Sequence, residues 1–159
     1  MGTLDLILQF CLMGGCCVHC YTDWKEKLLY DEVNLLILLT GFVQAYLYDQ
    51  LLNALYGMLI TGIVFLVLFI IAKGGMGLGD VKLAFALGAW LGWEQGLMSL
   101  LLAIWLGCAV GFTLILFQLK KRTDAIAFGP YMCVAGVLMF YYGPSIINWY
   151  FSLITYLGG

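Results

Sequence analysis

All seven lysine and arginine residues of this chain lie in three short clusters, and long apolar stretches separate the clusters. The clusters are Lys25 with Lys27, Lys73 with Lys82, and Lys120, Lys121 and Arg122. Of the 159 residues, 64% are hydrophobic and only 10% are charged, whereas a soluble domain has about 25% charged residues. Such a chain cannot cover a water-exposed surface. The pattern predicts one domain, residues 1–159, with an all-α fold: a polytopic membrane helix bundle.

The apolar stretches predict about six transmembrane helices. A helix needs about 20 apolar residues to cross the hydrocarbon core of a bilayer. The expected spans are Leu4–Tyr21, Val33–Leu47, Leu51–Ala72, a fourth that ends near Trp93, Leu97–Leu119 and a sixth that begins near Tyr131. The second and fourth are short for a full crossing. We expect Pro144 to kink or end the sixth span, and the tail that follows either extends this span or lies along the interface.

Six spans place the three basic clusters on one face of the membrane. The opposite face carries Asp5, Asp49 and Glu94 and no basic residue. Because lysine- and arginine-rich loops stay in the cytoplasm, we expect the basic face to be cytoplasmic and both termini to lie outside. Four aromatic residues near the outer ends are typical of the membrane interface: Tyr46, Tyr48, Trp90 and Trp93. No basic residue precedes the first stretch, which is therefore predicted to be a retained span rather than a cleaved signal peptide.

Several classes of site are not predicted. The net charge of −2 offers no basic surface for nucleic acid. The six cysteines do not form the two paired motifs of a four-cysteine zinc site, and those inside the first span favour packing over disulfides. Cys16 and Cys20 share a helix face close to His19, which can reach Asp23 one turn later; for His19 too, packing is favoured. We therefore expect no metal and no cofactor.

The stretch KGGMGLGDVKL, residues 73–83, places a glycine-rich charged loop between two spans. It matches neither GxxxxGK[ST] nor GxGxxG, so phosphate-loop and dinucleotide sites are not indicated. Its glycines permit close approach of another chain, and Asp80 stands at the cytoplasmic end of the fourth span. Lys82 cannot face Asp80 from two positions away on a helix. It is interpreted as an orienting or substrate-contacting charge.

Small residues follow Asp80 at steps of four, and a similar row lies in the fifth span. The two rows are Ala84, Gly88, Gly92 and Gly96, and then Ala103, Gly107 and Gly111. Such rows let membrane helices approach closely. Tight packing of this kind would hold Asp80 in a fixed place.

A second aspartate, Asp23, stands at the cytoplasmic end of the first span, at the same expected depth as Asp80. Two carboxyl groups on touching helices can activate one water, one ionised to take its proton and one protonated to polarise a carbonyl. On spacing alone, the alternative stays open that both are solvated loop charges. That is the interpretation given to Glu26, Asp31, Glu32 and Asp124.

Three blocks of the sequence resemble the type IV prepilin peptidases, which are bacterial membrane aspartic proteases. Residues 74–93 look like the family's GxGD block, residues 127–136 are similar to its Phe-Gly-Pro element, and residues 22–41 resemble the block with the first aspartate. The resemblance implies that Asp23 and Asp80 are catalytic. It implies supporting or substrate-binding roles for six further residues: Gly77, Gly79, Lys82, Phe128, Gly129 and Pro130.

The resemblance also implies a reaction and a location. The expected function is cleavage of the basic leader peptide of type IV prepilins and pseudopilins, at the cytoplasmic face of the bacterial inner membrane. The partners are then these leader peptides and the lipid bilayer. Acidic residues near the first aspartate, Glu26, Asp31 and Glu32, could attract a basic leader.

Two features depart from the family pattern. Tyr30 stands where many relatives have a proline, and only 22 residues precede Asp23, which leaves no room for the cysteine-rich segment associated with N-methylation. We therefore expect a peptidase-only form whose product keeps a free N-terminal amine. Two alternatives are carried forward: a presenilin-like intramembrane protease, and a small transporter or channel with a carboxylate relay.

Overall fold

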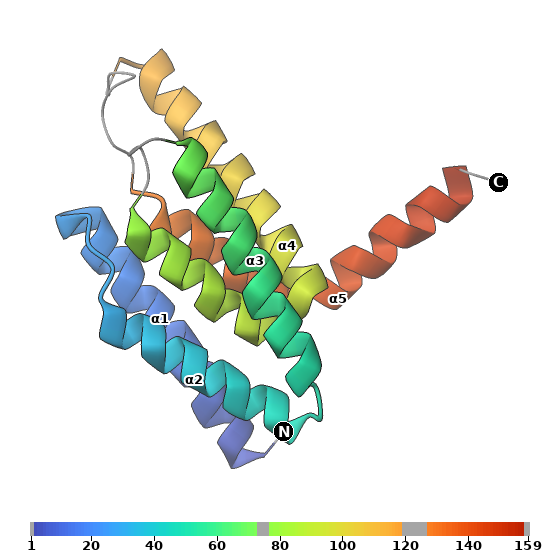
Figure 1. Ribbon diagram of the computed structural model, residues 1–159. Coiled ribbons are helices and arrows are strands. Elements are labelled where there is room, and N and C mark those ends of the chain that lie inside the picture. Colours follow the sequence, from blue (N-terminus) through green and yellow to red (C-terminus); the bar gives the residue numbers. More distant parts are fainter. Residues whose placement is uncertain (1, 73–76, 119–126, 158–159) are drawn as a thin grey trace.

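The structure is a computed structural model that describes residues 2–72, 77–118 and 127–157, without the side chains of residues 151 and 157. The predicted charges and loop positions at 73–76 and 119–126 lie outside these residues. The described chain is helical throughout, with α1 (Thr3–Glu26), α2 (Asp31–Leu47), α3 (Leu51–Ile71), α4 (Leu78–Leu116) and α5 (Gly129–Leu157) (Figure 1). The predicted all-α class is confirmed.

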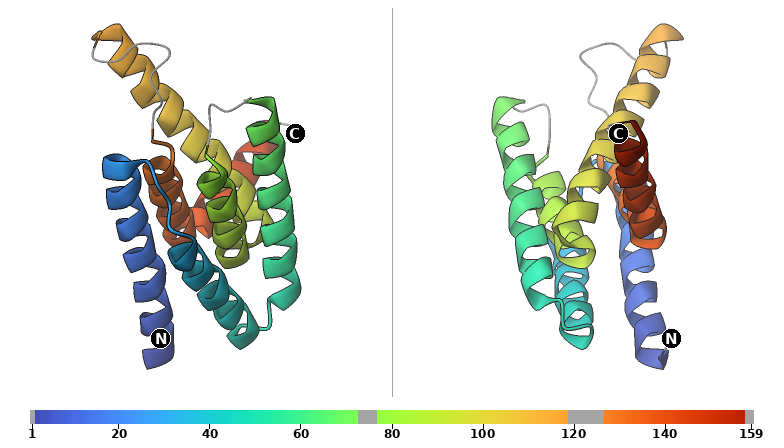
Figure 2. Two further views of the ribbon diagram at one scale, coloured as in Figure 1. Left: turned by 60° about the vertical axis from the view of Figure 1, so that its left-hand side comes forward. Right: turned by 90° about the vertical axis from the view of Figure 1, so that its right-hand side faces the viewer.

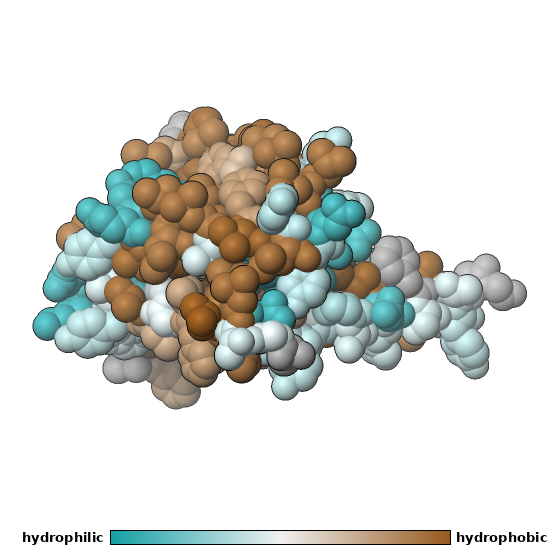
Figure 3. Space-filling model, turned by 90° about the horizontal axis from the view of Figure 1, so that it is seen from below, coloured by the Kyte–Doolittle hydropathy of each residue, from teal (hydrophilic) through white to brown (hydrophobic). Residues whose placement is uncertain are grey.

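Four of these helices, α1, α3, α4 and α5, are long and apolar enough to cross a membrane. The remaining helix, α2, has 17 residues and corresponds to the short second span. A polytopic membrane bundle is therefore the fold. Apolar side chains also cover much of the outside of the bundle, as the view from below shows (Figure 3). The number of complete crossings and the side of the termini stay predictions.

The expected fourth and fifth spans are the two helical arms of α4, whose 39 residues are interrupted by non-helical backbone at Gly92. There the backbone has φ 72° and ψ −179°, a conformation that favours glycine. The side-chain oxygen of Asn53 accepts a hydrogen bond from the Trp93 N–H at 3.4 Å, which replaces an intrahelical bond lost at the break. As a result α4 turns back on itself (Figures 1 and 2).

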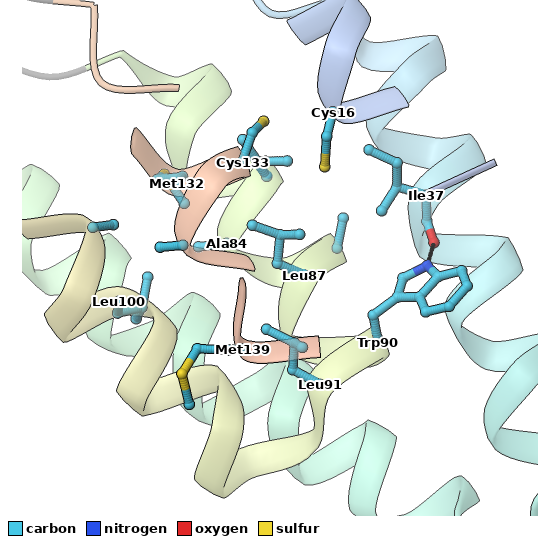
Figure 4. Packing of buried hydrophobic residues seen from close by; sticks show 14 of the residues in the cluster. Cys16, Ile37, Ala84, Leu87, Trp90, Leu91, Leu100, Met132, Cys133 and Met139 are labelled. Carbon is cyan, nitrogen blue, oxygen red and sulfur yellow. Dashed lines mark hydrogen bonds between the residues drawn. The ribbon is translucent and has the colours of Figure 1, made fainter. Parts of the chain in front are cut away.

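Helix α4 is the centre of the bundle and packs against α2, α3 and α5, whereas α1 packs against α2 and α5. Trp90 belongs to this core, because its indole Nε1 donates to the Ile37 carbonyl at 2.7 Å (Figure 4). Trp90, expected among the interfacial aromatic residues, is only 6% exposed, so its ring faces the core of the bundle rather than the surface. Burial of the indole is possible because Gly41 of α2 leaves room for the ring.

The small residues of the first row bring α3 and α4 together, as predicted. A Cβ atom at Gly88 would collide with Thr61 and with the backbone of Gly57. The Thr61 hydroxyl lies 2.6 Å from the Gly57 carbonyl oxygen and 3.1 Å from that of Ala84. This contact fixes the N-terminal half of α4, which carries Asp80.

Helix α5 begins at Gly129, with Pro130 in its first turn, as predicted. Pro144 lies inside the helix, so it does not end the element. The C-terminal part of α5 projects away from the other helices (Figure 1).

Candidate active site

Asp23 lies in the last turn of α1, where its side chain is bound to the start of α5. Only 6% of the residue is exposed. The backbone N–H of Gly129 donates to Asp23 Oδ2 at 2.8 Å. Since the first N–H groups of a helix have no partner within the helix, the carboxylate caps α5. A Cβ atom at position 129 would lie 2.7 Å from the same oxygen, so glycine is required at this contact.

Asp80 is held in a similar way at the start of α4. It is the third residue of the helix, and its Oδ2 accepts a hydrogen bond from the Gly77 N–H at 3.2 Å. A third-position acidic side chain that binds the backbone before a helix is half of a capping box. The other oxygen, Oδ1, is buried and has no hydrogen-bond partner among the residues that the structure describes. One oxygen of Asp80 is therefore fixed, and the other is available for chemistry.

The two aspartates border one cavity of about 190 Å³. The volume exceeds that of a single water, about 30 Å³, and the two carboxyl groups interact electrostatically. The helices α1 and α4 do not pack against each other, so the cavity lies between their ends rather than at a helix contact. The cavity is lined by Asp23, Lys27, Leu28, Leu29, Asp31, Gly77, Leu78, Gly79 and Asp80.

Sequence reasoning missed the role of the short loop after α1. Leu29 packs against both glycine-bearing helix starts: a Cβ atom at Gly79 would lie 2.9 Å from its Cβ, and one at Gly129 would lie 3.1 Å from its Cδ2. Lys27, in the left-handed conformation with φ 54°, ends α1, and its charge attracts Asp23. The sequence feature that could have indicated this role is a pair of leucines, Leu28 and Leu29, within an otherwise charged segment.

Lys82 has a partner that was not predicted. Its Nζ lies 2.6 Å from Asp31 Oδ2, across the N-termini of α4 and α2, and both side chains are more than half exposed. As predicted, Lys82 does not pair with Asp80; its partner is Asp31. Asp31, expected as a solvated loop charge, is instead paired and borders the cavity. It is therefore not a free acidic group for a basic leader.

Phe128 belongs to the packing below the cavity. Its ring lies 5.6 Å from that of Phe65 in α3 and 6.2 Å from that of Tyr131. A Cβ atom at Gly107 would lie 3.0 Å from the Phe128 ring, so the second row of small residues makes room for it. Phe128 thus joins α3, α4 and α5 directly before Gly129, which holds Asp23.

The cysteines and His19 lie outside the cavity. All six thiols are free, and no group of three potential ligands among the described residues is placed to hold a metal. Cys17 and Cys20 have a C-x-x-C spacing, yet Cys17 is exposed while the Cys20 Sγ approaches the Pro130 carbonyl oxygen at 4.0 Å. His19 is fully buried, as a packing residue should be, and faces Asn34 of α2.

Comparison with known proteins agrees with this arrangement. The family model of the type IV leader peptidase family matches residues 10–112, which include both aspartates. A protein of Aeromonas salmonicida named prepilin leader peptidase/N-methyltransferase is 36% identical over 84% of this chain and 48% of its own length. Two further proteins of the same name also match. The one from Aeromonas hydrophila is 36% identical over 83% of this chain and 48% of its own length. The one from Pseudomonas aeruginosa is 33% identical over 80% of this chain and 47% of its own length.

The chain spans about half the length of these curated relatives. No solved structure matches it. The family match covers α1 to most of α4, and therefore both helix ends that carry the aspartates. This chain belongs to the type IV leader peptidase family.

Proposed function

We propose that this protein is a membrane aspartic endopeptidase that removes the leader peptide of type IV prepilins and pseudopilins. The observation that carries the proposal is the shared cavity: Asp23 and Asp80, 57 positions apart, border it from two helix ends, each with one oxygen bound to a glycine N–H. Fixed oxygens leave the other oxygen of each carboxyl group to face a substrate.

The proposed reaction uses the pair as a unit that shares one proton. The ionised carboxylate takes a proton from water as the water oxygen attacks the scissile carbonyl carbon, and the protonated carboxyl group gives its proton to the carbonyl oxygen. The tetrahedral intermediate then collapses and the C–N bond breaks: the carboxyl group that took the water proton gives it to the leaving amine, and the other carboxylate takes a proton from one hydroxyl of the intermediate, which restores the shared proton. The products are a leader with a C-terminal carboxyl group and a pilin with a new amine.

The shape of the cavity suits an extended peptide. Gly77 and Gly79 present backbone without side chains on one side, which permits close approach of a second chain. Leu28, Leu29 and Leu78 supply apolar lining on the other parts of the wall. Asp31 is paired with Lys82, so attraction of a basic leader is left to Glu26 and Glu32, which stand next to the lining residues Lys27 and Asp31 in the sequence.

Two further features belong to the proposal. The basic residues favour a cytoplasmic position for the cavity in the bacterial inner membrane. A prepilin held in the same membrane presents its leader on that face. The acidic residues at the other end of the bundle, Asp5, Asp49 and Glu94, would then lie outside.

The test is mass spectrometry of a prepilin co-expressed with this protein and, separately, with an empty vector. We expect a new N-terminus at the leader boundary only when the protein is present. Uncut prepilin beside well-inserted protein would remove the proposed function. A cut within the apolar segment of the prepilin would favour the presenilin-like alternative.

A further inference from the structure

The contact between α1 and α2 contains one fully buried polar pair that the proposed chemistry does not use. His19 of α1 is 0% exposed and Asn34 of α2 is 4% exposed. The two side chains lie close enough to interact, but neither ring nitrogen and neither amide atom has a hydrogen-bond partner within the described part of the chain. Buried polar atoms of this kind need an explanation in any native structure.

The pair lies in an otherwise apolar and close-packed seam. One turn before His19, a Cβ atom at Gly15 would lie 2.8 Å from Ile37 Cγ1 and 3.4 Å from Val33 Cγ1. One turn after His19 stands Asp23, on the same helix face. The loop that joins the two helices then carries Leu29 onto the two glycine contacts. The seam therefore leads directly to the wall of the cavity.

Stability does not explain why this pair is polar. A buried polar group without a good partner destabilises the folded state, and replacement of both members of such a pair by apolar groups of the same shape can be neutral or stabilising. A buried polar pair can nevertheless select one register between helices, because any other register would set each polar group against apolar side chains instead of against the other. Neutral imidazole has one donor and one acceptor, and the asparagine amide can match either tautomer.

We propose that His19 and Asn34 are positioning residues that fix the register of α1 against α2 and so hold Asp23 in place at the cavity. The proposal rests on the proposed function only for its activity readout. A register shift along α1 would move Asp23 away from the Gly129 N–H, which it now contacts at 2.8 Å. It would also move Leu29 from the two helix starts.

The test compares His19→Leu, Asn34→Val and the double variant with His19→Gln, which keeps a polar partner for Asn34. The matched control is Ser99→Ala, which removes a buried polar group from the second half of α4. We expect both apolar variants to lower kcat for leader cleavage about tenfold with KM within about twofold of wild type. Thermal stability should be unchanged or higher, the double variant no slower than the singles, and His19→Gln close to wild type.

Register is measured directly by the distance between spin labels at exposed Phe10 and Leu39 in a cysteine-free protein. The distance distribution should broaden or shift in His19→Leu and stay unchanged in His19→Gln and Ser99→Ala. An unchanged distribution and kcat in both apolar variants would overturn the proposal, as would a His19→Gln variant as slow as His19→Leu. If wild type cuts no prepilin, the proposed function fails, while the distances still decide the register.

Discussion

At the scale of single residues, Leu29 connects the two helix starts that hold the aspartates. It contacts the positions where Gly79 and Gly129 would carry a side chain. Contact at Gly79 involves the Cβ atom of Leu29, which cannot move without its backbone, rather than the flexible end of the side chain. The glycine at position 79 is therefore explained by packing as well as by access for a substrate.

We expect Gly79→Ala to lower both the midpoint of thermal unfolding and kcat, the latter about tenfold. The added methyl group forces Leu29 away from the cavity wall, and overpacking of this kind costs typically 1–3 kcal/mol. Adding Leu29→Ala should not restore the lost stability in full, because alanine keeps the Cβ atom that would lie 2.9 Å from the added methyl group. Gly14→Ala is the matched control, since a Cβ atom there meets nothing within 4 Å. A Gly79→Ala protein as stable and as active as Gly14→Ala would contradict this account.

At the same scale, the sequence predicted which aspartates meet but not how they are held. Asp23 and Asp80 could be found because few carboxyl groups stand at the ends of apolar spans. The N–H groups that bind them belong to the backbone of Gly129 and Gly77, and only the folded chain brings Gly129 to α1. The pairing of Lys82 with Asp31 likewise depends on how α4 lies against α2.

At the scale of helices, the closest approach is that of α3 and α4. At this crossing Gly57 and Gly88 face each other, and the Thr61 hydroxyl binds the carbonyl oxygens next to them. Since lipid supplies no hydrophobic force between helices, such close contacts and interhelical hydrogen bonds hold membrane helices together. The position of Asp80 depends on this crossing.

We expect Gly88→Ala to lower the free energy of unfolding by about 1–3 kcal/mol. The methyl group would collide with backbone atoms of Gly57, which cannot rotate away as a side chain can. Unfolding by denaturant in detergent measures the change, with Gly14→Ala again as control. Equal stability of the two variants would contradict this expectation, because it would show that the contact between α3 and α4 has space for a methyl group.

The break in α4 depends on contacts that the sequence pattern does not reveal. Apolar runs on either side of Glu94 predicted two separate spans, and the structure has two helical arms there, which turn back on each other at Gly92. The turn depends on a positive φ at Gly92 and on Asn53 of α3, which binds the Trp93 N–H. Trp90 is buried for a similar reason, because Gly41 of α2 makes room for it. Such matches between distant residues are not visible in a periodic pattern.

At the scale of the whole molecule, four helix ends meet around the cavity and the other ends lie away from it. The end of α1 and the starts of α2, α4 and α5 all contribute to the aspartate contacts or the cavity. At the opposite end, Tyr48 after α2 interacts with Asp5 near the start of α1. The helix ends alternate between the two ends of the bundle because basic clusters and apolar spans alternate along the chain.

We expect cysteine labelling to place residues 25–31 and 77–79 on the cytoplasmic side, in a protein without its native cysteines. The reason is that all seven basic residues were assigned to that face and none to the other. A single cysteine at Asp49, in the turn between α2 and α3, should be labelled from outside only. Labelling of residues 77–79 from outside would reverse the orientation and separate the cavity from a cytoplasmic leader.

The central claim is that Asp23 and Asp80 act together as the catalytic pair, and cleavage of purified prepilin in detergent tests it most directly. Asparagine keeps the size of each side chain but can neither take nor share the proton. Asp23→Asn and Asp80→Asn should each reduce kcat by about 100- to 10,000-fold, with unchanged thermal stability. The double variant should be no slower than the singles, because residues that act as a unit are not additive.

The matched control for this measurement is Asp49→Asn, an exposed carboxylate with φ 57° at the far end of the bundle, where asparagine suits the backbone. The account predicts that this control cleaves prepilin at the wild-type rate, while both catalytic variants leave it uncut on the same timescale. Near-normal cleavage by a well-folded Asp80→Asn protein would contradict the account.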